Sequence, residues 1–156
     1  MPFVEHLHQV DRYDLPDGDI TKLTFTPGQY DFIWASPPCP QYSRLAMPWY
    51  PVTEVDLGLW EHCLRLIDEA RPRFYVIENV RGAQRIWGPP EVRCGSFMLW
   101  GVMPAWPRGC YRKRIDHVRN PRERARVPRA LALQVRDIIE AALDPRSSGP
   151  TPSRAP

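Results

Sequence analysis

The sequence has few glycines, no pair of cysteines at metal-binding spacing and no long apolar run. Its 156 residues include nine glycines and 19 prolines, and such a composition argues against a glycine-loop nucleotide site. No apolar run approaches the roughly 18 residues of a membrane span. The start, MPFVEHLHQV, lacks the basic and then apolar stretches of a signal peptide. We therefore expect a protein without a membrane span or a leader.

The cysteines exclude two further classes of protein. Cys39, Cys63, Cys94 and Cys110 are widely separated, and no CxxC pair is present. This spacing indicates neither a zinc site nor a disulfide framework, so we expect no metal. Reduced cysteines are typical of cytoplasmic proteins, and we expect a cytoplasmic location.

Length and charge indicate one soluble domain with an uneven surface. The chain is 43% apolar and 25% charged, with a net charge of +3. Nine basic and two acidic residues lie between Arg108 and Arg129, and 19 of the 21 basic residues of the chain are arginine. Arginine binds phosphates and base edges in a forked geometry. This segment fits a nucleic-acid contact and a solvated basic face equally well.

Two apolar runs with a helical pattern between them predict a βαβ unit. Residues 30–35 (YDFIWA) indicate a buried strand that ends at Ser36-Pro37-Pro38, and residues 74–80 (FYVIENV) indicate a second strand. Residues 54–70 carry apolar side chains at helical spacing, and Arg71-Pro72 ends that helix. Strand, helix and strand in this order predict a parallel sheet.

The rest of the chain is assigned from its composition and periodicity. Residues 94–102 are expected to form a third strand, residues 104–126 an irregular basic segment, and residues 128–143 a helix that opens at a proline. The tail, residues 144–156, has no hydrophobic residue larger than alanine or proline and is expected to be disordered. The expected organisation is one α/β domain over residues 1–143.

Two residues that can carry chemistry follow the predicted strands. Cys39 comes after the first strand and Glu78 ends the second, and ligands of an open α/β sheet bind outside the carboxyl ends of its strands. A thiolate is a nucleophile, and a nearby carboxyl group supplies or holds a proton. Most cysteines are small buried hydrophobes, and the other three fit that pattern. Cys39 does not, because it follows two prolines on a loop at a strand end.

These residues resemble the motifs of a known family. SPPCPQYS at 36–43 resembles the Pro-Pro-Cys motif of the DNA cytosine-5 methyltransferases, and IENVRG at 77–82 resembles their Glu-Asn-Val motif. Either tripeptide alone is a weak signal, whereas the ordered pair, each at the end of a predicted strand, is a strong one. Softer similarities involve DGDITKL at 17–23, CGSFMLWGVMP at 94–104, as in compact and often phage-encoded members, and the closing helix at 128–143.

The resemblance implies a Rossmann-like class I S-adenosylmethionine-dependent methyltransferase fold with a mostly parallel sheet. It also implies a mechanism in which Cys39 attacks C6 of a cytosine flipped out of DNA. Glu78 would contact N3 and the exocyclic amine and protonate the ring. The methyl group of S-adenosylmethionine would go to C5, and loss of the C5 proton would release Cys39.

Further residues are assigned by the resemblance alone. Asp19 would accept a hydrogen bond from the adenine amine of the cofactor, Ile20 would pack on the adenine ring, and Pro38 would line the junction of cytosine and methyl donor. Arg112 and Arg114 match an Arg-x-Arg motif that steadies the flipped base. For these two arginines, a charge run that faces phosphates is an equal alternative.

Two elements of the family pattern are missing from the sequence. MPFVEHLHQVDRYDLP contains no Phe-x-Gly-x-Gly motif, which in the family wraps the methionine end of the cofactor. An N-terminally truncated fold without its first strand and helix is therefore expected. A misassigned start, a natural truncation, or pairing with a second copy or a complementing chain would each account for the gap. Too few residues follow Arg114 for a target-recognition domain, so we expect weak sequence selectivity.

Three functions are compatible with the sequence. The first is a DNA cytosine-5 methyltransferase that acts on cytosine-containing DNA with S-adenosylmethionine. The second is a non-catalytic, methyltransferase-like DNA-binding protein, or a subunit that needs a partner chain. The third is methyl transfer to a free nucleotide or to an RNA cytosine.

Overall fold

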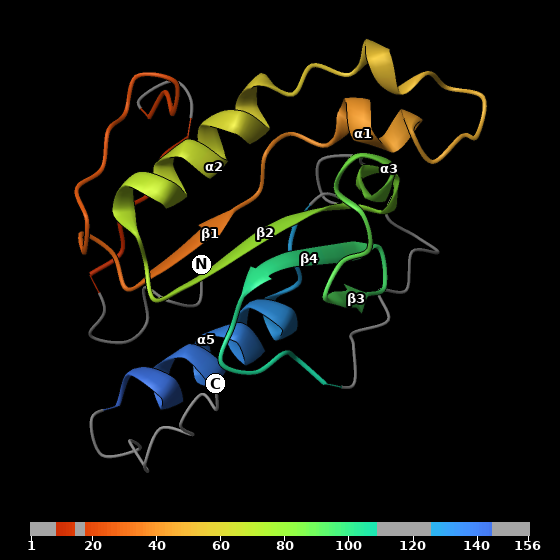
Figure 1. The fold of residues 1–156 in the computed structure, drawn as a ribbon. Coiled ribbons are helices and arrows are strands. Elements are labelled where there is room, and N and C mark those ends of the chain that lie inside the picture. Colours follow the sequence, from red (N-terminus) through yellow and green to blue (C-terminus); the bar gives the residue numbers. More distant parts are fainter. Residues whose placement is uncertain (1–8, 15–17, 109–125, 145–156) are drawn as a thin grey trace, which may run out of the picture.

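The computed structural model describes residues 9–14, 18–108 and 126–144. Its elements are a strand, helices and a second strand, followed by a hairpin and a closing helix (Figure 1). In chain order they are β1 (Phe32–Ala35), α1 (Pro40–Arg44), the 3-10 helix η2 (Val52–Glu54), α2 (Gly58–Ala70), β2 (Phe74–Val80), the 3-10 helix η3 (Arg81–Ala83), α3 (Gln84–Trp87), β3 (Val92–Cys94), β4 (Phe97–Val102) and α5 (Arg129–Leu143).

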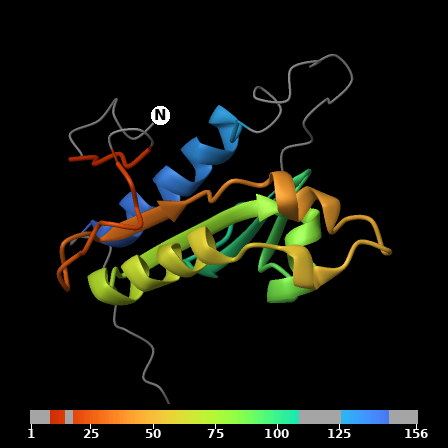
Figure 2. The same ribbon diagram turned by 90° about the horizontal axis from the view of Figure 1, so that it is seen from above.

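Helices α2 and α5 lie on opposite sides of a four-stranded sheet (Figures 1 and 2). Successive side chains of a strand point to opposite faces, so Ile77 of β2 belongs to the core on the α2 side and Val76 to the core on the α5 side. A core packs against each face, which explains why most residues of the strands are apolar. β1, expected to be buried, is only partly buried. The first core contains Tyr42, Leu45, Trp60, Ile67, Ile77, Ala83, Met98 and Trp100, and the second contains Val76, Cys94, Phe97, Leu99, Leu131, Val135 and Ile139.

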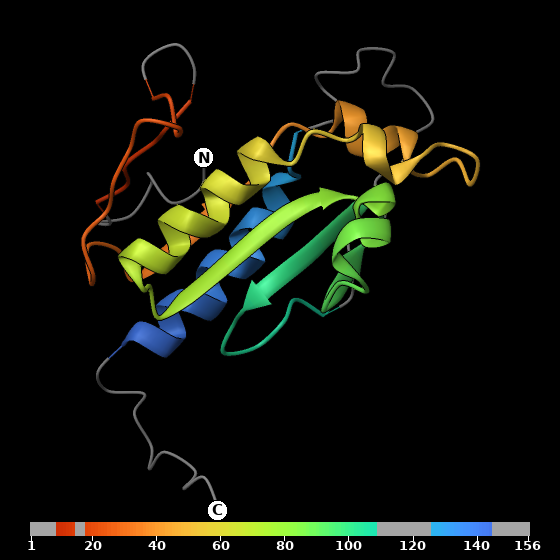
Figure 3. The same ribbon diagram turned by 45° about the horizontal axis from the view of Figure 1, so that its top comes forward.

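The sheet is mixed, with the strand order β1-β2-β4-β3. β1 and β2 are parallel, whereas β4 runs antiparallel to both of its neighbours. Figure 3 shows β2 and β4 pointing in opposite directions. The fold is mixed α/β as predicted, but the expectation of a mostly parallel sheet is wrong.

The connection after β2 explains the direction of β4. Between β1 and β2 the chain returns through α2 to the start of the sheet, as a parallel pair requires. After β2 the chain forms η3 and α3 and stays at the carboxyl end of that strand. β4 begins with Phe97 beside Val80, the last residue of β2, so it can only run back along its neighbour.

Residues 94–102, predicted as one strand, belong to a hairpin. Cys94 of β3 pairs with Phe97 of β4, so Gly95 and Ser96 form a two-residue turn. Gly95 has a φ of 65°, which glycine adopts without a steric penalty. A glycine at the first of the two turn positions is a strong hairpin signal.

The predicted helices are present with small shifts at their ends. α2 begins at Gly58 rather than residue 54, and Asp56 accepts a hydrogen bond from the Gly58 N–H. It ends at Ala70, because Arg71 adopts a left-handed conformation with φ of 47° immediately before Pro72. No helix in the described ranges combines the length and apolar character of a bilayer span.

Candidate active site

The carboxyl ends of β1 and β2 bring the two predicted reactive residues together. Ala35 lies beside Ile77 in the parallel pair, so the next residues along each strand, Ser36 and Glu78, are also neighbours. A side-chain hydrogen bond joins Ser36 to Glu78, and the Trp34 indole N–H donates to Ser36 Oγ at 2.8 Å. Ser36 was not among the site residues expected from the sequence.

Glu78 is a buried carboxyl group, only 7% exposed. Loss of hydration disfavours the charged form of an acid and raises the pKa of Glu78 to about 7, although the Ser36 hydrogen bond acts in the opposite direction. Near neutral pH the group therefore exists in both protonation states. Such a carboxyl group can either donate or hold a proton at the edge of the sheet.

Cys39 lies at the N-cap position of α1 and is half-buried. Burial raises the pKa of its thiol, and the negative charge of Glu78 raises it further. The Ser43 hydroxyl donates a hydrogen bond to the Cys39 carbonyl oxygen at 3.1 Å. The Cys39 thiol thus lies within range of the charge of Glu78 at the carboxyl end of the parallel strand pair.

Asn79 holds the loop that carries Cys39. It is 1% exposed, and its side-chain amide donates to the Pro37 carbonyl oxygen at 3.1 Å while Asn79 Oδ1 accepts from the Val80 N–H at 2.9 Å. Asn79 belongs to the Glu-Asn-Val tripeptide, in which a role was expected for the glutamate alone. A polar residue inside an apolar strand was the available signal, since buried polar groups need partners.

Gly82 provides a close contact beneath α1. A β-carbon at this position would collide with the Tyr42 carbonyl oxygen and would lie 2.8 Å from the Ala46 nitrogen. Tyr42 and Leu45 on this side of α1 are each 1% exposed. Figure 1 shows α1 and α3 together at the end of the sheet towards which β1 and β2 run. The absence of a side chain at Gly82 therefore allows the Cys39 helix to pack directly on the segment after β2.

The other cysteines differ from Cys39. Cys63 and Cys94 are buried, Cys63 on α2 and Cys94 in the core on the α5 side. Burial raises the pKa of Cys63 to about 11. Cys110 lies outside the described residues. Buried thiols of this kind behave as small hydrophobes.

The predicted cofactor residues lie on two different segments. Asp19 Oδ1 accepts bonds from the Thr21 N–H at 3.0 Å and the Thr21 hydroxyl at 2.7 Å, and Asp19 Oδ2 lies 3.3 Å from Lys22 Nζ. The Thr21 hydrogen bonds lower the pKa of Asp19, so the group is an ionised acceptor. Ile20 follows it on the same turn and is partly exposed.

Pro38 is exposed and lies on the loop of Cys39, away in sequence from the Asp19 turn. Its neighbour Pro37 is buried and is the residue that Asn79 contacts. Arg112 and Arg114 lie outside the described residues, as does most of the basic segment from Arg108 to Arg129. Cys39 and Glu78 thus lie near each other at the carboxyl ends of β1 and β2, whereas Asp19 lies on a turn earlier in the chain.

Comparison with known proteins gives one family. The family model for the C-5 cytosine-specific DNA methylases matches residues 4–85, which is more than half of the chain and includes both the Cys39 loop and Glu78. No curated protein and no solved structure matches the chain significantly.

Proposed function

The chain belongs to the C-5 cytosine-specific DNA methylase family, and from this premise we propose that it methylates cytosine at C5 in DNA. The observation that carries the proposal is the pairing of Cys39 with a buried Glu78 whose pKa is about 7. A nucleophile and a proton donor at one edge of a sheet are what addition to a pyrimidine ring requires.

In the proposed reaction, the Cys39 thiolate adds to C6 of a cytosine that has left the base stack. Glu78, in its protonated form, donates its proton to N3, so the electron pair displaced by the sulfur is held in the ring and makes C5 nucleophilic. S-adenosylmethionine, when bound, supplies the methyl group that C5 takes. Loss of the C5 proton to a base then expels Cys39 as thiolate, and return of the N3 proton to Glu78 restores the neutral aromatic ring.

The two pKa shifts define the proton that has to move. Near neutral pH the resting site holds a Cys39 thiol and a Glu78 group that is partly ionised, because the pKa of the thiol lies above its ordinary value and that of Glu78 is about 7. Transfer of one proton from Cys39 to Glu78 gives the reactive combination of thiolate and carboxylic acid. The negative charge of Glu78 is then lost as the thiolate forms, which removes the repulsion between them.

Asp19, Ile20 and Pro38 are the proposed cofactor contacts. The ionised Asp19 carboxylate suits the exocyclic amine of adenine, since its Lys22 partner is exposed and its oxygens retain acceptor capacity. Arg112 and Arg114 are proposed to steady the flipped cytosine. The residues for the methionine end of the cofactor are proposed to come from a second copy or a complementing chain.

The test is methyl transfer from tritiated S-adenosylmethionine to cytosine-containing DNA, together with adduct formation on DNA that contains 5-fluorocytosine. The fluorine blocks loss of the group at C5, so the Cys39 adduct should persist and be found by mass spectrometry on the Cys39 peptide. Failure to label any DNA, with no adduct, would refute the proposed activity. RNA and free cytidine nucleotides in competition identify the preferred substrate.

A second candidate is a DNA-binding protein without catalysis. The observation that favours it is the excess of seven positive charges between Arg108 and Arg129, which would bind phosphates without any cofactor. Calorimetry separates the two functions. This candidate predicts no binding of S-adenosylmethionine and a DNA affinity that falls as salt rises.

A further inference from the structure

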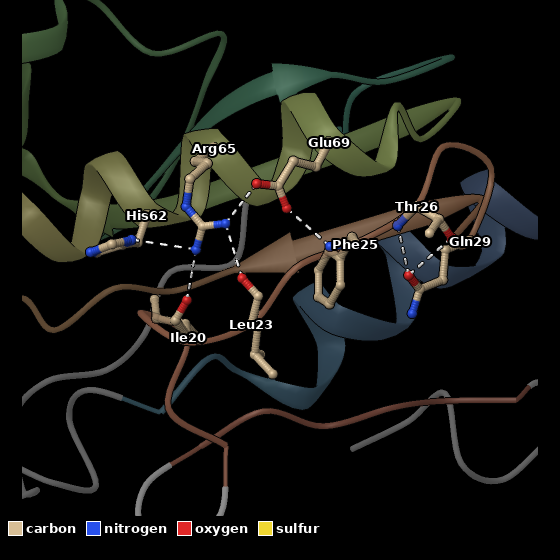
Figure 4. Close-up of polar contacts among 8 residues, drawn as sticks. All are labelled: Ile20, Leu23, Phe25, Thr26, Gln29, His62, Arg65 and Glu69. Carbon is tan, nitrogen blue, oxygen red and sulfur yellow. Dashed lines mark hydrogen bonds and ion pairs between the residues drawn. The ribbon is translucent and has the colours of Figure 1, made fainter.

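Two residues of α2, one helical turn apart, bind the segment that carries Asp19 (Figure 4). Arg65 Nη2 donates to the Ile20 carbonyl oxygen at 3.1 Å, and Arg65 Nη1 donates to the Leu23 carbonyl oxygen at 2.9 Å. Glu69 Oε2 accepts from the Phe25 N–H at 3.0 Å. These three contacts join side chains of α2 to backbone groups more than 40 positions away in the sequence.

The two side chains also hold each other. Arg65 Nη1 lies 2.7 Å from Glu69 Oε1, and their side chains are 34% and 28% exposed. The pKa of Glu69 is lowered first by the Phe25 N–H and then by Arg65, so the carboxylate is charged and both of its oxygens are used. His62 Nδ1 lies 3.5 Å from Arg65 Nη2 on the preceding turn. A forked guanidinium with fixed acceptors sets position more rigidly than a single charge.

The bound segment has little regular structure of its own. Residues 18–30 form neither a helix nor a strand, so no ladder of backbone hydrogen bonds fixes them. Within this segment the Lys22 N–H bonds to the Asp19 carbonyl oxygen at 3.0 Å, which closes the turn that presents Asp19. The Arg65 contact to Ile20 falls on the residue directly after Asp19, so a shift of that carbonyl moves the Asp19 carboxylate.

We infer that Arg65 and Glu69 are positioning residues that set the Asp19 turn for the adenine end of the cofactor. The inference rests on the proposed function, because it gives the turn its ligand. Neither residue touches the reacting atoms. Their effect is therefore expected on cofactor affinity rather than on the chemical step.

The experiment compares Arg65→Gln, Arg65→Lys and Glu69→Gln with Asp68→Asn, an exposed carboxylate at the neighbouring position of α2 that controls for loss of a charge. Arg65→Gln is expected to weaken S-adenosylmethionine binding and raise its KM about tenfold, which is the usual scale for a charged hydrogen bond. The kcat at saturating cofactor and the DNA affinity should stay within about twofold. Arg65→Lys should recover part of the affinity, because an ammonium reaches fewer of the acceptors.

Hydrogen exchange gives a second readout that needs no cofactor. Amides of residues 19–25 should exchange faster in Arg65→Gln and Glu69→Gln than in the wild type and in Asp68→Asn. If the wild type is active and the folded Arg65→Gln variant binds S-adenosylmethionine as tightly as the wild type, the inference is overturned. The proposed function is not affected by that result. An equal loss of cofactor affinity, DNA affinity and kcat would also overturn it, because that pattern indicates general damage to the fold.

The proposed function fails in a different way. If the wild type neither binds S-adenosylmethionine nor methylates DNA, both the proposed function and the role assigned to the Asp19 turn are refuted. The exchange measurement then still shows whether Arg65 fixes this turn.

Discussion

Asn79 donates a hydrogen bond to the carbonyl oxygen of Pro37 at 3.1 Å, and this bond ties the end of β2 to the loop that carries Cys39. The two residues are adjacent in space because β1 and β2 are parallel and in register. Glu78 and Asn79 therefore have different roles at this edge of the sheet. Glu78 faces the proposed chemistry, and Asn79 fixes the backbone that presents the nucleophile.

Replacement of Asn79 by alanine is expected to lower the free energy of unfolding by about 1–3 kcal/mol, because the Pro37 carbonyl loses its partner in a buried place. Urea unfolding followed by circular dichroism measures the change. Gln84→Ala removes two exposed hydrogen bonds, one to the Arg81 carbonyl and one from Arg93, and should cost no more than about 0.5 kcal/mol. Equal costs for the two variants would contradict the role given to Asn79.

Cys39→Ser separates a catalytic role from a packing role. We expect loss of methyl transfer with a change in the free energy of unfolding within about 1 kcal/mol, because the side chain lies half-exposed at the start of α1. Cys63→Ser places a hydroxyl group in the buried face of α2 and should destabilise the fold more than Cys39→Ser does. A large loss of stability in Cys39→Ser would instead identify Cys39 as a packing residue.

The elements that the sequence predicted best have strong local signals. β2 matches the predicted residues 74–80 because an apolar run is flanked by Pro72 and Gly82. The sequence placed Cys39 on a loop and predicted no helix after it, yet proline is well tolerated in the first turn of a helix, and Pro40 stands there with Cys39 as the N-cap residue. The direction of β4 has no such local signal, because it depends on the chain staying at the carboxyl end of β2 and then turning back at Gly95 within an apolar run.

In the candidate site, too, some features could be predicted from local sequence signals and others could not. The meeting of Cys39 with Glu78 follows from a parallel strand pair and could be predicted. The bonds from Asn79 to Pro37 and from Arg65 to Ile20 could not, because they are tertiary contacts to backbone carbonyls 42 and 45 positions away. Any residue offers a carbonyl oxygen, so such acceptors leave no mark in the sequence.

Gly82→Ala is expected to destabilise the fold by about 1–3 kcal/mol, because the added β-carbon meets backbone atoms of Tyr42 in α1 and of Ala46 just after it, which cannot rotate away. The same change should also displace Cys39 and reduce methyl transfer. Gly58→Ala is the control, since a β-carbon there meets only the Asp56 side-chain oxygen at 3.1 Å. We expect Gly58→Ala to be neutral or slightly stabilising, and thermal unfolding of the two variants tests the difference.

Burial of Glu78 makes stability depend on pH. An unfolded chain ionises this residue near its ordinary pKa of 4.5, whereas the folded protein does so at about 7. The contribution of Glu78 to the free energy of unfolding is therefore fully present below about pH 4.5. It is lost as the pH rises from about 4.5 to about 7, and the loss levels off above that pH.

Glu78→Gln should remove this dependence. The difference in free energy of unfolding between the variant and the wild type should shift in favour of the variant by up to about 3 kcal/mol from about pH 4.5 to about pH 8. This figure follows from about 1.4 kcal/mol per pKa unit. Urea midpoints across this range measure the effect. Parallel pH profiles for the two proteins would show that Glu78 is not buried as described.

Glu78 should also control the reactivity of Cys39. The negative charge of Glu78 is the second cause, after burial, of the raised pKa of the Cys39 thiol, and Glu78 is ionised above about pH 7. Glu78→Gln removes that charge, so the thiol should ionise at lower pH and react faster with iodoacetamide at about pH 8. The rate is read by mass spectrometry on the Cys39 peptide, which excludes the other cysteines. Glu91→Gln, an exposed residue at the start of the hairpin, should leave the rate unchanged. Equal alkylation rates in Glu78→Gln and the wild type would show that the two groups are too far apart to exchange a proton.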